Sequence, residues 1–198
     1  MVGLLGQTCF ISKDEPKDVK ATLLDEHWIN AMQEELVQFE KNEVWELVPR
    51  PDDHNVIGTK WIFKNKFDEY ENITRNKARL VVQGHTQIEG VDLDENFFPV
   101  ARLEAIRLLI CLACLLKFKP YQMDVKSAFL NGIVQEEVYV EQPKGFVDPS
   151  NLGHVYRLKK ALYGLKQAPR AWYERLTIFL LKNEYTRGRV DNTLFIKK

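Results

Sequence analysis

The sequence predicts a fold of the α+β class, in which an antiparallel sheet packs against helices. Two kinds of periodicity indicate this class. Apolar residues recur at helical spacing in residues 26–41, whereas residues 56–67 alternate between large apolar and basic or polar side chains. The order in which helical and strand segments follow one another along the chain then favours α+β over the other classes.

The first half of the chain is expected to form an amphipathic helix and a basic β-hairpin. The helix has apolar side chains every three or four positions, with acids between them. The hairpin strands are separated by a polar turn, and each strand carries bases. The predicted segments of this half are a helix at 26–41, strands at 44–48, 56–67 and 78–82, and turns at 49–53 and 68–72.

The second half begins with an acidic loop and a helix, residues 103–117, that is apolar almost all round. Such a helix is expected to be buried, and Pro120 is expected to end it. Cys111 and Cys114 lie within it and are interpreted as a buried structural pair that holds no metal. The remaining predicted segments are strands at 121–125, 136–142, 155–158 and 192–198, a helical turn at 126–132, and a helix from Pro169 to about Asn183.

The chain is expected to contain a loosely ordered leader, residues 1–24, and one domain, residues 25–198. No run of 18 apolar residues occurs, so a membrane span is not expected. The first ten residues lack the basic start of a secretory signal. Three cysteines do not make a disulfide framework, which favours an intracellular location in the cytoplasm or nucleus.

The formal net charge is zero, which taken alone argues against nucleic acid as a partner. The distribution of charge argues the other way. Residues 13–46 hold ten acids and four lysines, whereas residues 157–175 hold six bases and one acid. Because local surface charge decides what a protein attracts, a neutral total is compatible with a basic binding surface.

Asp124 is the strongest candidate for chemistry. It lies within the otherwise apolar segment 121–125, and a carboxylate in a buried strand is costly unless it is paired or binds a metal. The alternative is an ordinary aspartate at a strand end that caps the next helical turn.

Two basic segments are candidates for phosphate binding. Residues 160–173 lead from a strand to a helix through Gly164, and free N–H groups at a helix start attract phosphate. The hairpin bases could grip a phosphate chain through charge-assisted hydrogen bonds. For both segments the alternative is a solvated surface with ordinary capping.

Eight segments, in order, resemble the copia-type reverse transcriptases of retrotransposons. They extend the resemblance over nearly the whole chain, from about Glu15 to Phe195. These segments are residues 28–36, 45–49, 58–64, 75–81, 98–102, 122–132, 138–146 and 161–173.

The resemblance implies a right-hand polymerase, with the hairpin as fingers and Asp124 as the first palm carboxylate. It implies that Asp124 and the backbone carbonyl of Val125 bind metal and that Asp124 is catalytic. The residues it assigns to nucleotide binding are Lys64, Arg79, Phe129, Tyr163 and Gln167. The residues assigned to nucleic-acid binding are Lys66, Lys77, Lys166 and Arg170.

Within this resemblance, Phe129 would crowd a 2′-hydroxyl, and Tyr163 and Gln167 would position bases. The implied cofactor is Mg²⁺, with two ions in the complete enzyme and at most one weak site in this chain. The implied partners are an RNA or DNA template-primer, deoxynucleoside triphosphates and the rest of a polyprotein; no membrane is expected.

The chain departs from the family in ending at Lys198, before the Tyr-x-Asp-Asp hairpin. We therefore expect no polymerase activity from these 198 residues alone, marginal stability, and exposed apolar surface near Trp172 and Phe195. One alternative is a decayed, inactive remnant that retains at most nucleic-acid binding. A structural protein with coincidental motifs is the remaining alternative.

Overall fold

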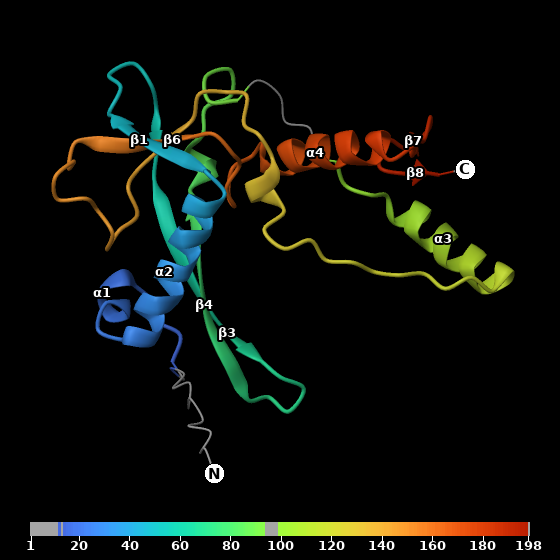
Figure 1. Cartoon of the computed structure of the whole chain (residues 1–198), viewed down its shortest axis with the longest axis horizontal. Coiled ribbons are helices and arrows are strands. Elements are labelled where there is room, and N and C mark those ends of the chain that lie inside the picture. Colours follow the sequence, from blue (N-terminus) through green and yellow to red (C-terminus); the bar gives the residue numbers. More distant parts are fainter. Residues whose placement is uncertain (1–11, 13, 94–98, 198) are drawn as a thin grey trace, which may run out of the picture.

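The computed structural model describes residue 12, residues 14–93 and residues 99–197. Helices and sheets are mixed along the chain, so the predicted α+β class is confirmed (Figure 1). In the described ranges, no helix is both long and apolar enough to cross a membrane. Residues 1–11 and 13 of the expected leader, and residues 94–98 of the loop before Pro99, lie outside the described residues.

Two helices precede the first strand. Sequence reasoning did not predict α1 (Val19–Thr22), which begins where the Asp18 carboxylate accepts a hydrogen bond from the Ala21 N–H at 2.8 Å. The helix predicted at residues 26–41 forms with the same bounds as α2 (Glu26–Lys41), and Asp25 caps its N-terminus. Its Trp28 indole N–H donates to the Asp14 carbonyl at 3.1 Å, which ties the preceding segment to the helix.

A four-stranded sheet forms one end of the molecule. Its strand order is β1 (Trp45–Pro49), β6 (His154–Leu158), β5 (Tyr139–Val140) and β2 (Val56–Ile57). Strands β1 and β6 are antiparallel, whereas β2 and β5 are parallel. The predicted strand at 136–142 is thus real but only two residues long.

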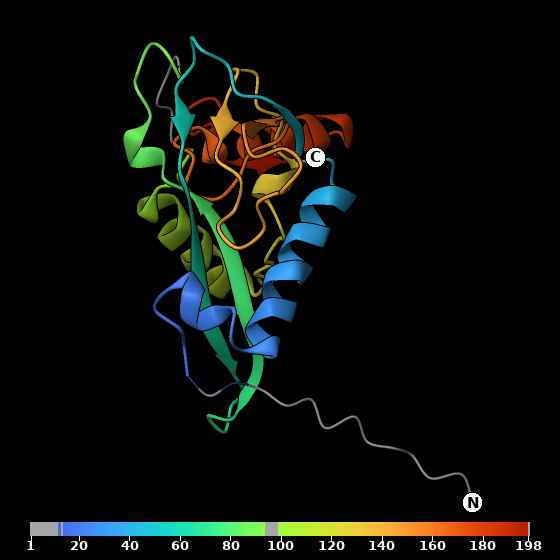
Figure 2. The ribbon, with the colours of Figure 1, turned by 90° about the vertical axis from the view of Figure 1, so that its left-hand side faces the viewer.

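The predicted hairpin is confirmed as β3 (Thr59–Phe67) and β4 (Ile73–Val82). The predicted strand at 56–67 divides at Gly58, because β2 pairs within the four-stranded sheet and β3 pairs with β4. The alternation predicted for β3 is also confirmed, since Thr59, Trp61, Phe63 and Asn65 are buried between exposed neighbours. Helix α2 lies along the hairpin (Figure 2) and buries Trp28 edge-on against Phe63, with ring centroids 5.4 Å apart.

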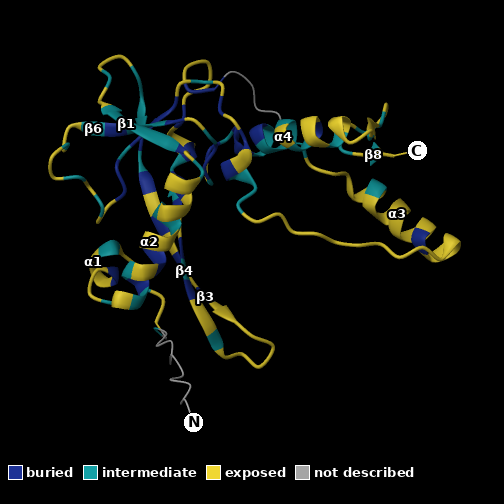
Figure 3. Cartoon of the chain, viewed as in Figure 1, coloured by how far each residue is buried: buried dark blue, intermediate teal, exposed yellow. Residues whose placement is uncertain are grey.

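The helix predicted at residues 103–117 forms, but the prediction that it is buried was wrong. Helix α3 (Leu103–Leu116) forms as expected, but Ala113 is its only buried residue among those described (Figure 3). Cys111 and Cys114, predicted to be buried, are exposed free cysteines. The helix stands away from the sheet and hairpin in Figure 1, so its apolar side chains meet no described element that could cover them. The helix ends at Leu116, before Pro120 is reached, and its C-cap Lys117 has a φ of 58°.

The predicted strand at 121–125 does not form. These residues are exposed and irregular, because none of the described strands lies beside them to supply backbone hydrogen bonds. The predicted helical turn that follows is present as a short 3₁₀ helix, η2 (Phe129–Asn131). Another, η1 (Gly84–Thr86), follows β4.

The C-terminal part contains α4 (Ala168–Lys182), which has Pro169 in its first turn as predicted. Strand β8 (Phe195–Ile196) confirms the predicted final strand and pairs with β7 (Thr186–Arg187), which was not predicted. Apolar surface is exposed near Phe195, as expected, at Leu194 and Ile196, and also on α4 at Ile178 and Phe179. Trp172 and Phe195 themselves are half-buried.

Candidate functional site

A large open hollow lies between α2, the hairpin and the segment that carries Asp124. Its volume is about 1210 Å³, larger than a typical small-molecule pocket. We call it the central hollow. Its charged lining residues are six bases and three acids, namely Lys41, Lys66, Arg75, Lys77, Arg79 and Lys126, and Glu34, Glu35 and Asp124.

The register of the hairpin explains why so many bases meet here. Lys64 is opposite Lys77, and Lys66 is opposite Arg75, so these four side chains emerge on one face of the two strands. Arg79 lies on the same face, opposite Ile62. The alternate positions are buried, which leaves the bases directed away from the core.

The structure places Asp124 at this hollow together with the hairpin bases, although the strand expected to carry it is absent. Asp124 and Val125 are both exposed, and both line the hollow. The predicted juxtaposition of the carboxylate with the basic hairpin is therefore present in the geometry.

Three of the predicted nucleotide-binding residues are in contact with one another. The Arg79 guanidinium lies over the Tyr163 ring, 5.3 Å from its centroid. The Phe129 ring meets the Tyr163 ring edge-on, with centroids 4.8 Å apart. Tyr163 also lines the central hollow, so this stack joins the hairpin to the η2 turn at the wall of the site.

Gly164 makes this arrangement possible. Its φ is +95°, and a Cβ at this position would lie 2.0 Å from the carbonyl oxygen of Val82. The backbones therefore approach closely, and the Val82 N–H donates to the Tyr163 carbonyl at 2.8 Å. This contact fixes Tyr163 at the outer edge of β4.

Lys64 is placed beside the hollow rather than in its lining. Its ammonium group forms an ion pair with Glu15 at 3.1 Å. The same carboxylate accepts the backbone N–H of Asn65 at 2.8 Å, and these two contacts hold the pKa of Glu15 below its ordinary value. A phosphate bound by Lys64 would therefore compete with Glu15 for this ammonium group.

The structure places the three remaining predicted residues away from the hollow. Gln167 is buried, where its amide oxygen accepts from Gln87 at 2.9 Å and its amide N–H donates to the Asp92 carbonyl at 3.2 Å. Lys166 donates to the Gln87 carbonyl at 3.2 Å. Asp92, which lies in the loop that the sequence analysis describes as acidic, is itself buried.

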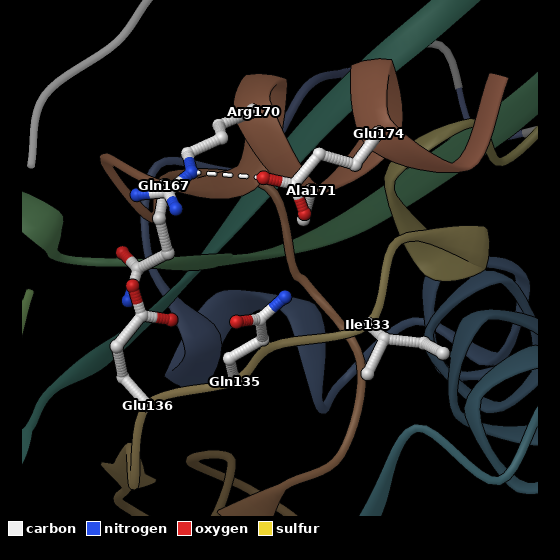
Figure 4. Close-up of a pocket in the computed structure, with 7 residues that line it drawn as sticks. All are labelled: Ile133, Gln135, Glu136, Gln167, Arg170, Ala171 and Glu174. Atoms are coloured by element: carbon white, nitrogen blue, oxygen red, sulfur yellow. Dashed lines mark hydrogen bonds and ion pairs between the residues drawn. The ribbon is translucent and has the colours of Figure 1, made fainter. Parts of the chain in front are cut away.

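Arg170 and Gln167 border a separate small pocket (Figure 4). The Arg170 guanidinium forms an ion pair with Glu174 at 3.0 Å, drawn as a dashed line in that view. The pocket encloses only about 10 Å³, which is room for roughly one water molecule. A nucleotide would not fit in it.

Sequence reasoning missed two acids of α2 that face the hairpin. Glu34 forms an ion pair with Arg75. Glu35 is half-buried, and burial raises its pKa although Lys77 opposes the shift. A sequence signal was present, because Glu35 continues the spacing of Trp28, Met32 and Phe39 along the apolar stripe.

The described residues contain no group of three or more His, Cys, Asp or Glu side chains arranged to hold a metal ion. Asp124 is therefore not part of such a group within the part of the chain that the structure describes. The positive charges that line the hollow with it are those of the hairpin, of Lys41 on α2 and of Lys126.

Comparisons with known proteins agree with the resemblance predicted from the motifs. Residues 42–198 match the family described as "Reverse transcriptase (RNA-dependent DNA polymerase)". The chain is 40% identical over 186 residues to the "Retrovirus-related Pol polyprotein from transposon RE1" of Arabidopsis thaliana, a match that covers 93% of this chain. It is 41% identical over 192 residues, or 95% of the chain, to the corresponding polyprotein from transposon TNT 1-94 of Nicotiana tabacum. The chain spans only 13% and 14% of the lengths of these two relatives.

Proposed function

Because this chain belongs to the reverse transcriptase family, we propose that the central hollow is where a polymerase of the copia type binds an incoming nucleotide and the template-primer. One observation carries the proposal: Asp124, the hairpin bases and the Arg79–Tyr163 contact border the same hollow. In this proposal the hairpin is the fingers, and the segment from Asp124 to η2 is part of the palm.

The residues around Asp124 suit a magnesium–triphosphate complex. Mg²⁺ is usually held by one or two carboxylates together with substrate phosphates, and here the exposed carboxylate of Asp124 shares the hollow with several bases. Asp124, with the Val125 carbonyl, would hold the ion. A bound ion stabilises the attacking and leaving oxygens of an in-line displacement.

The bases of the hairpin would bind the phosphates. Arg79 and Lys64 would neutralise the triphosphate, while Lys66 and Lys77 would contact the nucleic-acid backbone. Each charge-assisted hydrogen bond of this kind contributes about 1.5–3 kcal/mol.

The aromatic residues would orient the sugar and base. Phe129 would exclude a 2′-hydroxyl, and Tyr163 would stack on a base, an interaction that tolerates any sequence. Gln167, buried and bonded to Gln87, would act by supporting the Tyr163 loop. Lys166 and Arg170 would extend the basic surface along the nucleic acid, and the rest of the polyprotein would complete the site.

The test is equilibrium binding by the 198-residue chain, using Asp124→Asn and, as a control from an exposed turn, Asp52→Asn. We expect Asp124→Asn to weaken the Mg²⁺-dependent part of deoxynucleotide binding about tenfold or more, a change of about 1.4 kcal/mol. Primer-template binding should remain strongly dependent on salt in both variants, because phosphate contacts release counterions.

Equal Mg²⁺-dependent binding by wild type and Asp124→Asn would contradict the assignment of Asp124. Salt-dependent nucleic-acid binding without any Mg²⁺-dependent nucleotide binding would instead support the nucleic-acid-binding remnant.

A further inference from the structure

The residues just before α1 are fastened to the hairpin and to α2. The Ser12 N–H donates to the side-chain oxygen of Asn76 at 3.1 Å, and the Asn76 amide donates back to the Ser12 carbonyl at 2.9 Å. The Trp28 indole N–H donates to the Asp14 carbonyl at 3.1 Å. We call Ser12, Asp14 and Glu15 the N-terminal strap.

The anchor of the strap on the hairpin is polar and buried. Asn76 is opposite Asn65 across the two strands, and both residues are only 7% exposed. The Asn76 amide also donates to the Asn65 side-chain oxygen at 2.7 Å. Because a buried amide is costly to leave without partners, these contacts hold Ser12 in one place on β4.

Glu15 follows these anchors and places its carboxylate on two donors of β3. One oxygen lies 3.1 Å from the Lys64 ammonium group, and the other accepts the backbone N–H of Asn65 at 2.8 Å. An ammonium group and a neighbouring backbone N–H that converge on one anion make charge-assisted hydrogen bonds, which phosphate oxygens accept as readily as carboxylate oxygens. The two donors therefore form an anion site that Glu15 fills.

This anion site adjoins the central hollow and is accessible. Lys64 is opposite Lys77, which lines the hollow, and Lys66 and Arg75 lie on the same face of the hairpin. The side chain of Lys64 is 65% exposed and that of Glu15 is 37% exposed. Ion pairs this exposed are weak, so an anion of higher charge can displace Glu15 from the two donors.

We propose that the Lys64 ammonium group and the Asn65 N–H form a phosphate site at the edge of the central hollow, which Glu15 occupies as a built-in competitor until phosphate oxygens displace it. The inference rests on the proposed function, because that function already assigns Lys64 to phosphate binding. It adds Asn65 as the second donor and the N-terminal strap as the device that limits access.

The experiment compares wild type with Glu15→Gln by calorimetry, at low ionic strength and with Mg²⁺ present. The probes are inorganic tripolyphosphate and a short oligothymidylate. Glutamine can still accept from the Asn65 N–H, but it removes the charge that holds Lys64. We expect Glu15→Gln to bind at least one probe about three- to fivefold more tightly, because no ion pair has to be broken. The probe with the larger gain shows whether the phosphate is that of a triphosphate or of a nucleic-acid backbone.

Two controls separate competition at Lys64 from a general effect of charge. Asp14→Asn removes the same charge from the neighbouring exposed residue of the strap and keeps the Asp14 carbonyl that Trp28 binds. Its affinities should stay within about 1.5-fold of wild type. In a Lys64→Gln background, Glu15→Gln should also change affinity by less than about 1.5-fold, because the donor for which Glu15 competes is gone.

Nuclear magnetic resonance reports on the second donor directly. In wild type, saturation with the favoured probe should shift the backbone amide signal of Asn65, since that N–H exchanges a carboxylate oxygen for a phosphate oxygen. The amide signal of Gly153, in the turn before β6, should stay in place.

Equal gains for Glu15→Gln and Asp14→Asn would overturn the proposal, because they would show only repulsion between the strap and an anion. Weaker binding by Glu15→Gln would overturn it as well, since Glu15 would then position Lys64 for phosphate. A gain that persists in the Lys64→Gln background, or an Asn65 signal that does not move, would rule out the two-donor site. If no variant bound either probe, the proposed nucleotide site would fall and this inference with it. Binding by wild type that Glu15→Gln leaves unchanged would remove only the inference.

Discussion

At the scale of single residues, Gly164 decides how closely the Tyr163 loop can approach β4. The position needs a residue that tolerates a positive φ and that has no Cβ, and glycine meets both requirements. The contact orients the ring over which Arg79 lies. A backbone constraint thus sets the position of two side chains of the candidate site.

Replacing Gly164 with alanine should destabilise the protein by about 2–4 kcal/mol, since it combines backbone strain with a severe clash against the Val82 carbonyl. Urea denaturation followed by circular dichroism would measure the change. Gly153→Ala is the control, because its φ is ordinary and a Cβ there meets nothing within 4 Å. Similar stabilities for the two variants would contradict the role assigned to Gly164.

Asp68 determines the conformation of the hairpin turn. Its carboxylate accepts the backbone N–H groups of Tyr70 at 2.9 Å and Asn72 at 2.8 Å, which leaves the Tyr70 ring exposed at the tip. The hydrogen bond from Asn72 is the largest cause of a lowered Asp68 pKa. The turn is therefore held by an ionised side chain.

The stability of this turn should depend on pH. Because folding lowers the Asp68 pKa, its stabilising contribution is complete above the unfolded value of about 3.9. The contribution is lost as pH falls through the lower folded value. We expect the difference in unfolding free energy between wild type and Asp68→Asn to shrink from pH 7 to pH 2.5 in urea titrations. A difference that stayed constant over this range would show that the carboxylate charge is unimportant.

At the scale of elements, α3 shows that composition predicts a helix better than it predicts what covers that helix. Fourteen residues with only Glu104 and Arg107 charged form the helix as expected. Leu108, Leu115 and Leu116 are nevertheless 62–71% exposed. Their burial would require a partner surface, and none of the described elements provides one.

The exposed cysteines of α3 allow a direct test of its environment. In a Cys9→Ser background, Cys111 and Cys114 should both react with a thiol reagent in native buffer at nearly the rate measured in denaturant. A reaction slowed by several orders of magnitude at all protein concentrations would show that α3 is buried within one chain. Protection that appears only at high protein concentration would indicate self-association through α3.

At the scale of the whole molecule, local sequence patterns predicted those elements whose partners lie within the described residues. Helix α2, the hairpin and α4 were predicted because each has a clear period and packs within this chain. The strand at 121–125 and the burial of α3 were wrong, because both depend on neighbours that the described residues do not include. Helix α1 was missed because four residues show no period, and its cap at Asp18 was the only signal.

The candidate site was predictable to a similar extent. The motifs identified Asp124, Arg79, Phe129 and Tyr163. In the fold, Tyr163 contacts both Arg79 and Phe129, and Asp124 lines the same hollow as Tyr163. The motifs could not show that Gln167 is buried, since its partners Gln87 and Asp92 lie about eighty residues earlier. The position of Glu35 could have been read from the helical stripe, but its place in the hollow beside the bases of the hairpin could not.

The division of one extended segment at Gly58 has a mechanical consequence. Strand β2 is fixed in the four-stranded sheet, while β3 continues from it into a hairpin nine residues long, about 30 Å at the usual rise per residue. The Gln83 N–H donates to the Gly58 carbonyl at 2.9 Å, so both strands of the hairpin leave the sheet through the same joint. A rotation of about 5° about Gly58 would displace the far end of the hairpin by about 2–3 Å without changing the pairing within the four-stranded sheet. The geometry at Gly58 therefore sets where the bases at the far end of the hairpin lie relative to the sheet.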